Sequence, residues 1–123
     1  MTNKPRNAVC IVCTDRRRSV DFYRKAFSAE LLDGDHSFSC PWLQLGGLTI
    51  TLLENAAKPS SLDFSEQAMA TLLFEVDDLD AAFTRAVDHG ARVISPPDEG
   101  GITFMVADPD GIIIEVMQST PDE

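Results

Sequence analysis

The sequence predicts an α+β protein built from two copies of one β-α-β-β-β unit. The segments Ala8–Asp15 and Thr71–Asp78 lie 63 residues apart, and each is an apolar run of strand length that ends in an aspartate. A helix-like segment follows each of them, and then a short strand and a hairpin that ends in Gly47–Glu54 or Gly111–Gln118. An internal repeat of this length determines the architecture before any single motif is considered.

The chain has 123 residues, which is the length of one domain. We expect a single domain over residues 1–123, with a first module at about 6–54, a linker at about 55–69 and a second module at about 70–118. The linker is polar and contains Pro59, Ser60 and Ser61, a composition typical of a connecting loop. No segment approaches the roughly 20 apolar residues of a membrane span, and none has the pattern of a signal peptide. We therefore expect a soluble, cytoplasmic protein with no membrane partner.

The formal net charge of the chain is -10. A protein of this charge repels nucleic acid and attracts cationic ligands over a long range, although solubility alone also explains an acidic composition. Three consecutive arginines, Arg16 to Arg18, begin the first predicted helix. They indicate either a solvated helix face or an anion site.

The three cysteines, Cys10, Cys13 and Cys40, are an odd number, which suits free thiols in a reducing compartment. Cys10 and Cys13 have the spacing of a chelating pair. They lie in a predicted strand, however, where residues three apart point to opposite faces, so we interpret the spacing as coincidental.

The two predicted helices follow the same design. Asp15 is placed to cap a helix that runs to about Phe27, and Asp78 to cap a helix that ends at Gly90. Each helix has one apolar stripe for a sheet to cover. The stripes consist of Val20, Tyr23 and Phe27 in the first helix, and of Leu79, Ala82, Phe83, Ala86 and Val87 in the second. His89 lies at the end of the second helix, where a histidine favours capping over catalysis.

Alternation along the last strand of each module predicts which side chains face the helices. It places Ile50 and Ile114 beneath the helices, and Thr51 and Glu115 on the opposite, concave face. Glu115 is a carboxylate in the middle of a strongly apolar strand, which follows a turn at Asp108–Gly111. A half-buried carboxylate is costly without a partner, so Glu115 either has a function or lies at a rim open to water.

Three segments in this order, Asp15–Tyr23, Phe74–Ala82 and Asp108–Glu115, resemble the vicinal oxygen chelate superfamily. This superfamily contains glyoxalase I, extradiol dioxygenases, fosfomycin resistance enzymes and bleomycin resistance proteins. The resemblance implies paired modules that curl into an incomplete barrel around a cavity. It also implies a homodimer in which each cavity takes one module from each chain.

The resemblance further implies metal-ligand positions, which on this chain are Ala8, Thr51, Thr71 and Glu115. Only Glu115 is a competent ligand. A catalytic transition metal normally has about three protein ligands, so we expect no bound metal and no cofactor.

The cavity that the resemblance implies is lined mostly by apolar and aromatic residues. Such a surface suits stacking on a flat organic ligand, and Glu115 favours a cation. For each aromatic residue alone, a place in the core or at a dimer contact is an equal alternative. The candidate ligand-binding residues are Glu115, Thr51, Thr71, Trp42, Phe104, Phe38, Cys10 and Met117.

These residues favour a metal-free protein that binds or sequesters a small organic molecule, such as an antibiotic, in a cavity at a dimer interface. The alternative is an enzyme of the superfamily, a lyase or dioxygenase that acts on a small organic substrate. No catalytic residue is identified, since Cys10 has no histidine predicted beside it. A module that recognises another protein is a third possibility, which a sizeable exposed apolar patch would favour.

Overall fold

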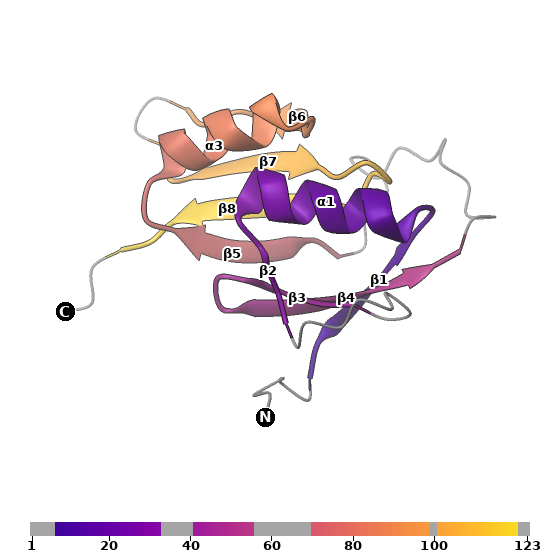
Figure 1. The fold of residues 1–123 in the computed structure, drawn as a ribbon. Coiled ribbons are helices and arrows are strands. Elements are labelled where there is room, and N and C mark those ends of the chain that lie inside the picture. The colour runs from indigo at the N-terminus through magenta and orange to yellow at the C-terminus, as the bar shows by residue number, and fades with distance from the viewer. Residues whose placement is uncertain (1–6, 33–40, 56–69, 99–100, 121–123) are drawn as a thin grey trace.

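The computed structural model describes residues 7–32, 41–55, 70–98 and 101–120, and it confirms the predicted α+β fold (Figure 1). Each module is a four-stranded mixed sheet with one helix. The first comprises β1 (Val9–Cys13), α1 (Arg16–Phe27), β2 (Glu30–Leu31), β3 (Trp42–Leu45) and β4 (Leu48–Glu54). The second comprises β5 (Leu72–Val76), α3 (Leu79–Asp88), β6 (Arg92–Ser95), β7 (Thr103–Ala107) and β8 (Ile113–Gln118). Phe38, Cys40 and nearly all of the predicted linker lie outside the described residues.

The two sheets have the same topology. Their strand orders are β1-β4-β3-β2 and β5-β8-β7-β6. In each sheet the first strand pairs in parallel with the last, and the remaining pairs are antiparallel. β1 and β5 are therefore equivalent edge strands.

Each helix is capped twice at its N-terminus. The predicted caps are confirmed, because the carboxylates of Asp15 and Asp78 accept bonds of 3.1 Å from the amides of residues 18 and 81. A second cap comes from the end of the last strand of the same module. Glu54 Oε1 accepts from the Arg16 amide at 2.8 Å, and Gln118 Oε1 accepts from the Leu79 amide at 2.9 Å. The internal repeat therefore includes the second cap, because in each module the last strand ends in a side chain that caps the helix.

The C-terminal end of α3 also follows the prediction. His89 is the C-cap residue, and its amide donates to carbonyls of the last turn. Gly90 follows with a φ of 97°, a conformation that glycine adopts without strain.

The core lies between the sheets and the helices. The predicted alternation is confirmed there, because Ile50, Leu52, Ile114 and Val116 are all fully buried. α1 and α3 lie beside one another, and Arg85 Nε of α3 donates to the Lys25 carbonyl of α1 at 2.6 Å (Figure 1). We call the sheet faces turned away from the helices the open face.

The turn between β7 and β8 joins the two modules. Asp108 Oδ1 accepts from the amides of Asp110 and Ile112 at 2.8 and 2.9 Å, which closes the turn. The Asp110 carboxylate accepts from the Thr14 hydroxyl at 2.6 Å and from its amide at 3.1 Å. Arg18 adds an ion pair of 3.1 Å to the same carboxylate. Asp110, a residue of the predicted turn, therefore also holds the start of α1.

None of the helices in the described ranges is long and apolar enough to cross a membrane.

Candidate functional site

The strand register defines two rows of side chains on the open face. In the first module, Thr51 of β4 is the register partner of Cys10 on β1 and of Trp42 on β3. In the second module, Glu115 of β8 is the partner of Leu73 on β5 and of Met105 on β7. Register partners on neighbouring strands are about 4.8 Å apart and point to the same side.

Glu115 is half-buried in its row, between two apolar side chains. Met117, two residues further along β8, lies on the same face by alternation. The carboxylate of Glu115 is therefore surrounded mostly by apolar side chains, and it remains accessible to a ligand from the open face.

A second carboxylate belongs to the same face. Glu75 of β5 is exposed and is the register partner of Met117, which makes it a diagonal neighbour of Glu115. Diagonal neighbours lie about 7 to 8 Å apart. Arg92, on the edge strand β6, is the single basic residue among the strands of the described ranges. The open face around Glu115 is therefore acidic, and a cation is the ligand that this charge favours.

Phe104 does not lie on the open face, contrary to the prediction. Its register partner is Val116, which faces the helices, and only 1% of its surface is exposed. Its ring packs edge-on against Phe83 of α3, with ring centroids 5.2 Å apart. Met105, the next residue of β7, lies on the open face instead, because it is the register partner of Glu115. The other phenylalanine predicted to line the cavity, Phe38, lies outside the described residues.

The Thr51 hydroxyl has a structural partner. It donates to the Pro41 carbonyl at 2.8 Å, and 8% of the residue surface is exposed. This bond holds the residue before β3 against β4. Because its proton is used in this bond, the Thr51 hydroxyl can act toward a ligand only as a hydrogen-bond acceptor.

A groove of about 430 Å³ runs between the edge strands β1 and β5, and we call it the seam groove. It is lined by residues 9–12, residues 70–73, Leu48 and Ile112. Both modules contribute equivalent positions, since Leu48 begins β4 and Ile112 precedes β8. Two of the predicted site residues, Cys10 and Thr71, belong to this groove. Apart from them, its side chains are aliphatic.

The two cysteines of β1 point to opposite sides, as the strand alternation predicted. Cys10 is exposed, whereas Cys13 is fully buried. Burial raises the pKa of the Cys13 thiol, which lies 3.7 Å from the Leu53 carbonyl. The pair cannot converge on one ion.

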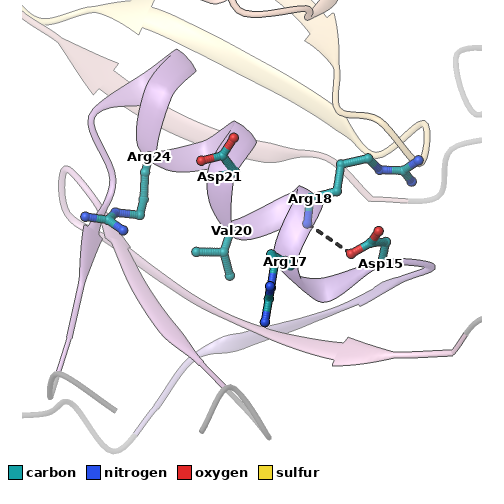
Figure 2. Close-up of a pocket in the computed structure, with 6 residues that line it drawn as sticks. All are labelled: Asp15, Arg17, Arg18, Val20, Asp21 and Arg24. Atoms are coloured by element: carbon teal, nitrogen blue, oxygen red, sulfur yellow. Dashed lines mark hydrogen bonds between the residues drawn. The ribbon is translucent and has the colours of Figure 1, made fainter. Parts of the chain in front are cut away.

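A second depression, of about 580 Å³, follows the exposed side of α1 (Figure 2). Its basic residues are Arg17, Arg18 and Arg24, accompanied by Asp15 and Asp21. Figure 2 shows that the three guanidinium groups point away from one another. They do not form a converging anion site. Arg17 is exposed on the helix face, whereas Arg18 is paired with Asp110.

The residues at the metal-ligand positions do not fit a transition metal. Ala8 offers no donor atom, Thr51 and Thr71 offer neutral hydroxyls, and Glu115 is the single strong ligand. Within the described ranges, no group of three or more His, Cys, Asp and Glu side chains is arranged to hold an ion.

Sequence reasoning missed Met105 and Glu75. The alternation that placed Glu115 on the open face also places Glu75 there, because Phe74 is buried on the other side. To place Met105 on the open face, one must know the register between β7 and β8, and alternation along one strand does not give that register.

Comparisons with known proteins agree with this geometry. Residues 6–116 match the family described as Glyoxalase/Bleomycin resistance protein/Dioxygenase superfamily. No curated protein sequence matches the chain significantly.

Several solved structures share the fold. TioX from Micromonospora sp. ML1 aligns with a TM-score of 0.70 and 21% identity, over 97% of this chain and 99% of that chain. The genomically encoded fosfomycin resistance protein FosX from Listeria monocytogenes aligns with a TM-score of 0.70 and 16% identity, over 95% and 94%. A protein of unknown function from Agrobacterium tumefaciens aligns with a TM-score of 0.65 and 26% identity, over 95% and 97%.

Proposed function

Because this chain belongs to the glyoxalase/bleomycin resistance protein/dioxygenase superfamily, we propose that it binds a small organic cation on its open face without a metal ion. The observation that carries the proposal is the position of Glu115 between Leu73 and Met105. A carboxylate in an apolar row interacts more strongly with a cation than one that is fully solvated.

The composition of the open face supports the cationic class of ligand. Glu75 adds a second negative charge near Glu115, and the whole chain carries a net charge of -10. In the first module, Trp42 is half-buried and in register with Thr51, so part of its indole surface is accessible. An indole face attracts cations and stacks on flat ligands.

Sequestration is the activity that these residues favour. Binding alone requires affinity and complementary charge, and it requires no nucleophile or general base. The description of the matching family includes bleomycin resistance proteins, so we propose an antibiotic or similar small molecule as the ligand.

We also propose that the protein works as a cytoplasmic homodimer, with each ligand site completed by the partner chain. Exposed aliphatic side chains on the open face support this, notably Leu53 and Leu73, which are 50% and 48% exposed. Burial of such surface is the main driving force for association. The free thiols of Cys10 and Cys13 suit the reducing cytoplasm.

A thermal-shift experiment tests the proposal. Purified protein is treated with EDTA and dialysed, and its melting temperature is measured with benzylammonium and with the uncharged benzyl alcohol. Ligands that bind the native state raise the melting temperature. We expect benzylammonium to raise it in the EDTA-treated protein, and benzyl alcohol to raise it much less.

Addition of Zn, Ni, Fe or Mn ions is the matched control. We expect these ions to leave the benzylammonium shift unchanged. A shift that appears only after a metal is restored would contradict the metal-free proposal.

A further inference from the structure

We infer that the ligand is an amphiphile, with an aliphatic body in the seam groove and an ammonium head at Glu115. The inference rests on the proposed function and adds the chemical class of the part of the ligand that does not touch Glu115.

The side chains that line the seam groove indicate that the part of the ligand bound there is aliphatic. No charged or aromatic side chain lines the groove, and eight of its ten residues are Val, Ile, Leu or Ala. Its volume of about 430 Å³ is within the usual range for small-molecule pockets, roughly 300 to 1,000 Å³. A flat aromatic ligand would find no stacking partner in the groove, whereas an alkyl chain would bury apolar surface along its whole length.

Leu73 connects the groove to the carboxylate. Its side chain lines the groove, and Leu73 is also the register partner of Glu115 on the adjacent strand. Since adjacent strands lie about 4.8 Å apart, a ligand that leaves the groove over Leu73 reaches Glu115 directly. The equivalent position in the first module is Cys10, whose register partner is Thr51. Of these two equivalent positions, only the one in the second module offers a cationic head a carboxylate next to the groove.

A chain-length series tests this geometry. Binding of linear alkylammonium ions, from butyl to octyl, is measured by calorimetry below their micelle-forming concentrations. The neutral alkanols of the same lengths serve as probes without a charged head. We expect affinity to rise about fourfold with each added methylene while the groove fills. We also expect each alkylammonium to bind more tightly than its alkanol.

Two variants provide a matched pair. Leu73→Asn changes a half-exposed open-face leucine that lines the groove, and Val87→Asn changes an exposed aliphatic residue of α3 that lies outside the groove and the open face. Octylammonium binding should weaken on the order of tenfold in L73N and less than twofold in V87N. Equal losses in the two variants would contradict a ligand body in the groove.

The outcomes separate this inference from the proposed function. If short and long alkylammonium ions bind equally and Glu115→Gln weakens both, the groove is not used and the inference fails, while the proposed function stands. If octanol binds as tightly as octylammonium and E115Q changes neither, Glu115 is not the counter-ion. That result would contradict both proposals, even though the groove binds alkyl chains.

Discussion

The Tyr23 hydroxyl donates a hydrogen bond of 2.7 Å to Asp108 Oδ2, and both groups are buried. Tyr23 belongs to α1 of the first module, and Asp108 begins the turn between β7 and β8 of the second. One side chain therefore closes the turn through its other oxygen and also anchors the helix of the opposite module. The β7–β8 turn and the positions of the two modules are coupled through this bond.

Tyr23→Phe should destabilise the protein by about 1 to 3 kcal/mol at neutral pH, because it leaves a buried carboxylate oxygen without its donor. The Tyr23 hydroxyl is also one of the groups that hold down the pKa of Asp108. The cost should therefore be smaller at acidic pH, where Asp108 is protonated. Urea unfolding at both pH values measures this difference, and an equal cost at both would show that Asp108 does not ionise as described.

Asp108→Asn should reduce the pH dependence of stability in the acidic range. Burial, assisted by the nearby charge of Asp110, raises the pKa of Asp108, and the bonds from Tyr23 and the turn amides oppose the rise. The folded protein therefore keeps a proton on Asp108 at pH values where the unfolded chain has released it, just above the ordinary value of 3.8. Stability must fall as pH rises through this window.

Asparagine cannot ionise at this position, so the stability of the variant should fall less as pH rises through this window. The measurement is the free energy of unfolding of D108N and of the unaltered protein over a series of pH values. Parallel curves for the two proteins would contradict the raised pKa.

Arg18→Gln should destabilise the protein by about 1 kcal/mol. The Arg18 guanidinium is 3.1 Å from the carboxylate of Asp110, whose side chain is 1% exposed. Because the Arg18 side chain is 48% exposed, water replaces part of the lost interaction. The neighbouring Arg17→Gln is the control, and it should change stability by less than about 0.5 kcal/mol. Equal effects in thermal unfolding would show that the Arg18 ion pair contributes nothing specific.

Sedimentation at micromolar concentration should give the mass of two chains. The open face carries exposed aliphatic side chains that a lone chain leaves in water. The internal repeat gives each chain two similar surfaces with which to cover them in a symmetric pair. A monomeric mass at this concentration would contradict the proposal that a partner chain completes the ligand site.

Sequence patterns predicted most of the fold because they are local and occur twice. Asp15 and Asp78 mark the helix starts, and the apolar alternation around Ile50 and Ile114 marks the buried sheet face. The second caps from Glu54 and Gln118 were not predicted, since they join residues about 40 positions apart. The bond between Tyr23 and Asp108, which joins residues 85 positions apart, was not predicted for the same reason.

Part of the geometry of the open face was predicted, and the error at Phe104 has a specific physical cause. The position of Glu115 follows from the parity of a single strand, whereas the choice between Phe104 and Met105 depends on the register of two strands. A slip of one residue moves a side chain to the other face of the sheet, so Phe104 was assigned to the wrong side. The seam groove was not predicted, because it forms where the edges of two separate sheets approach each other.

The most direct measurement is a calorimetric titration of benzylammonium into the unaltered protein, Glu115→Gln and Asp88→Asn, all without metal. Asp88 is an exposed carboxylate at the end of α3, away from the open face, so D88N controls for the loss of one negative charge. We predict that E115Q weakens binding by about 1 to 3 kcal/mol, the range for hydrogen bonds to a charged group, and that D88N changes it by less than about 0.5 kcal/mol. Equal affinities for the unaltered protein and E115Q would contradict the claim that Glu115 is the counter-ion of the ligand.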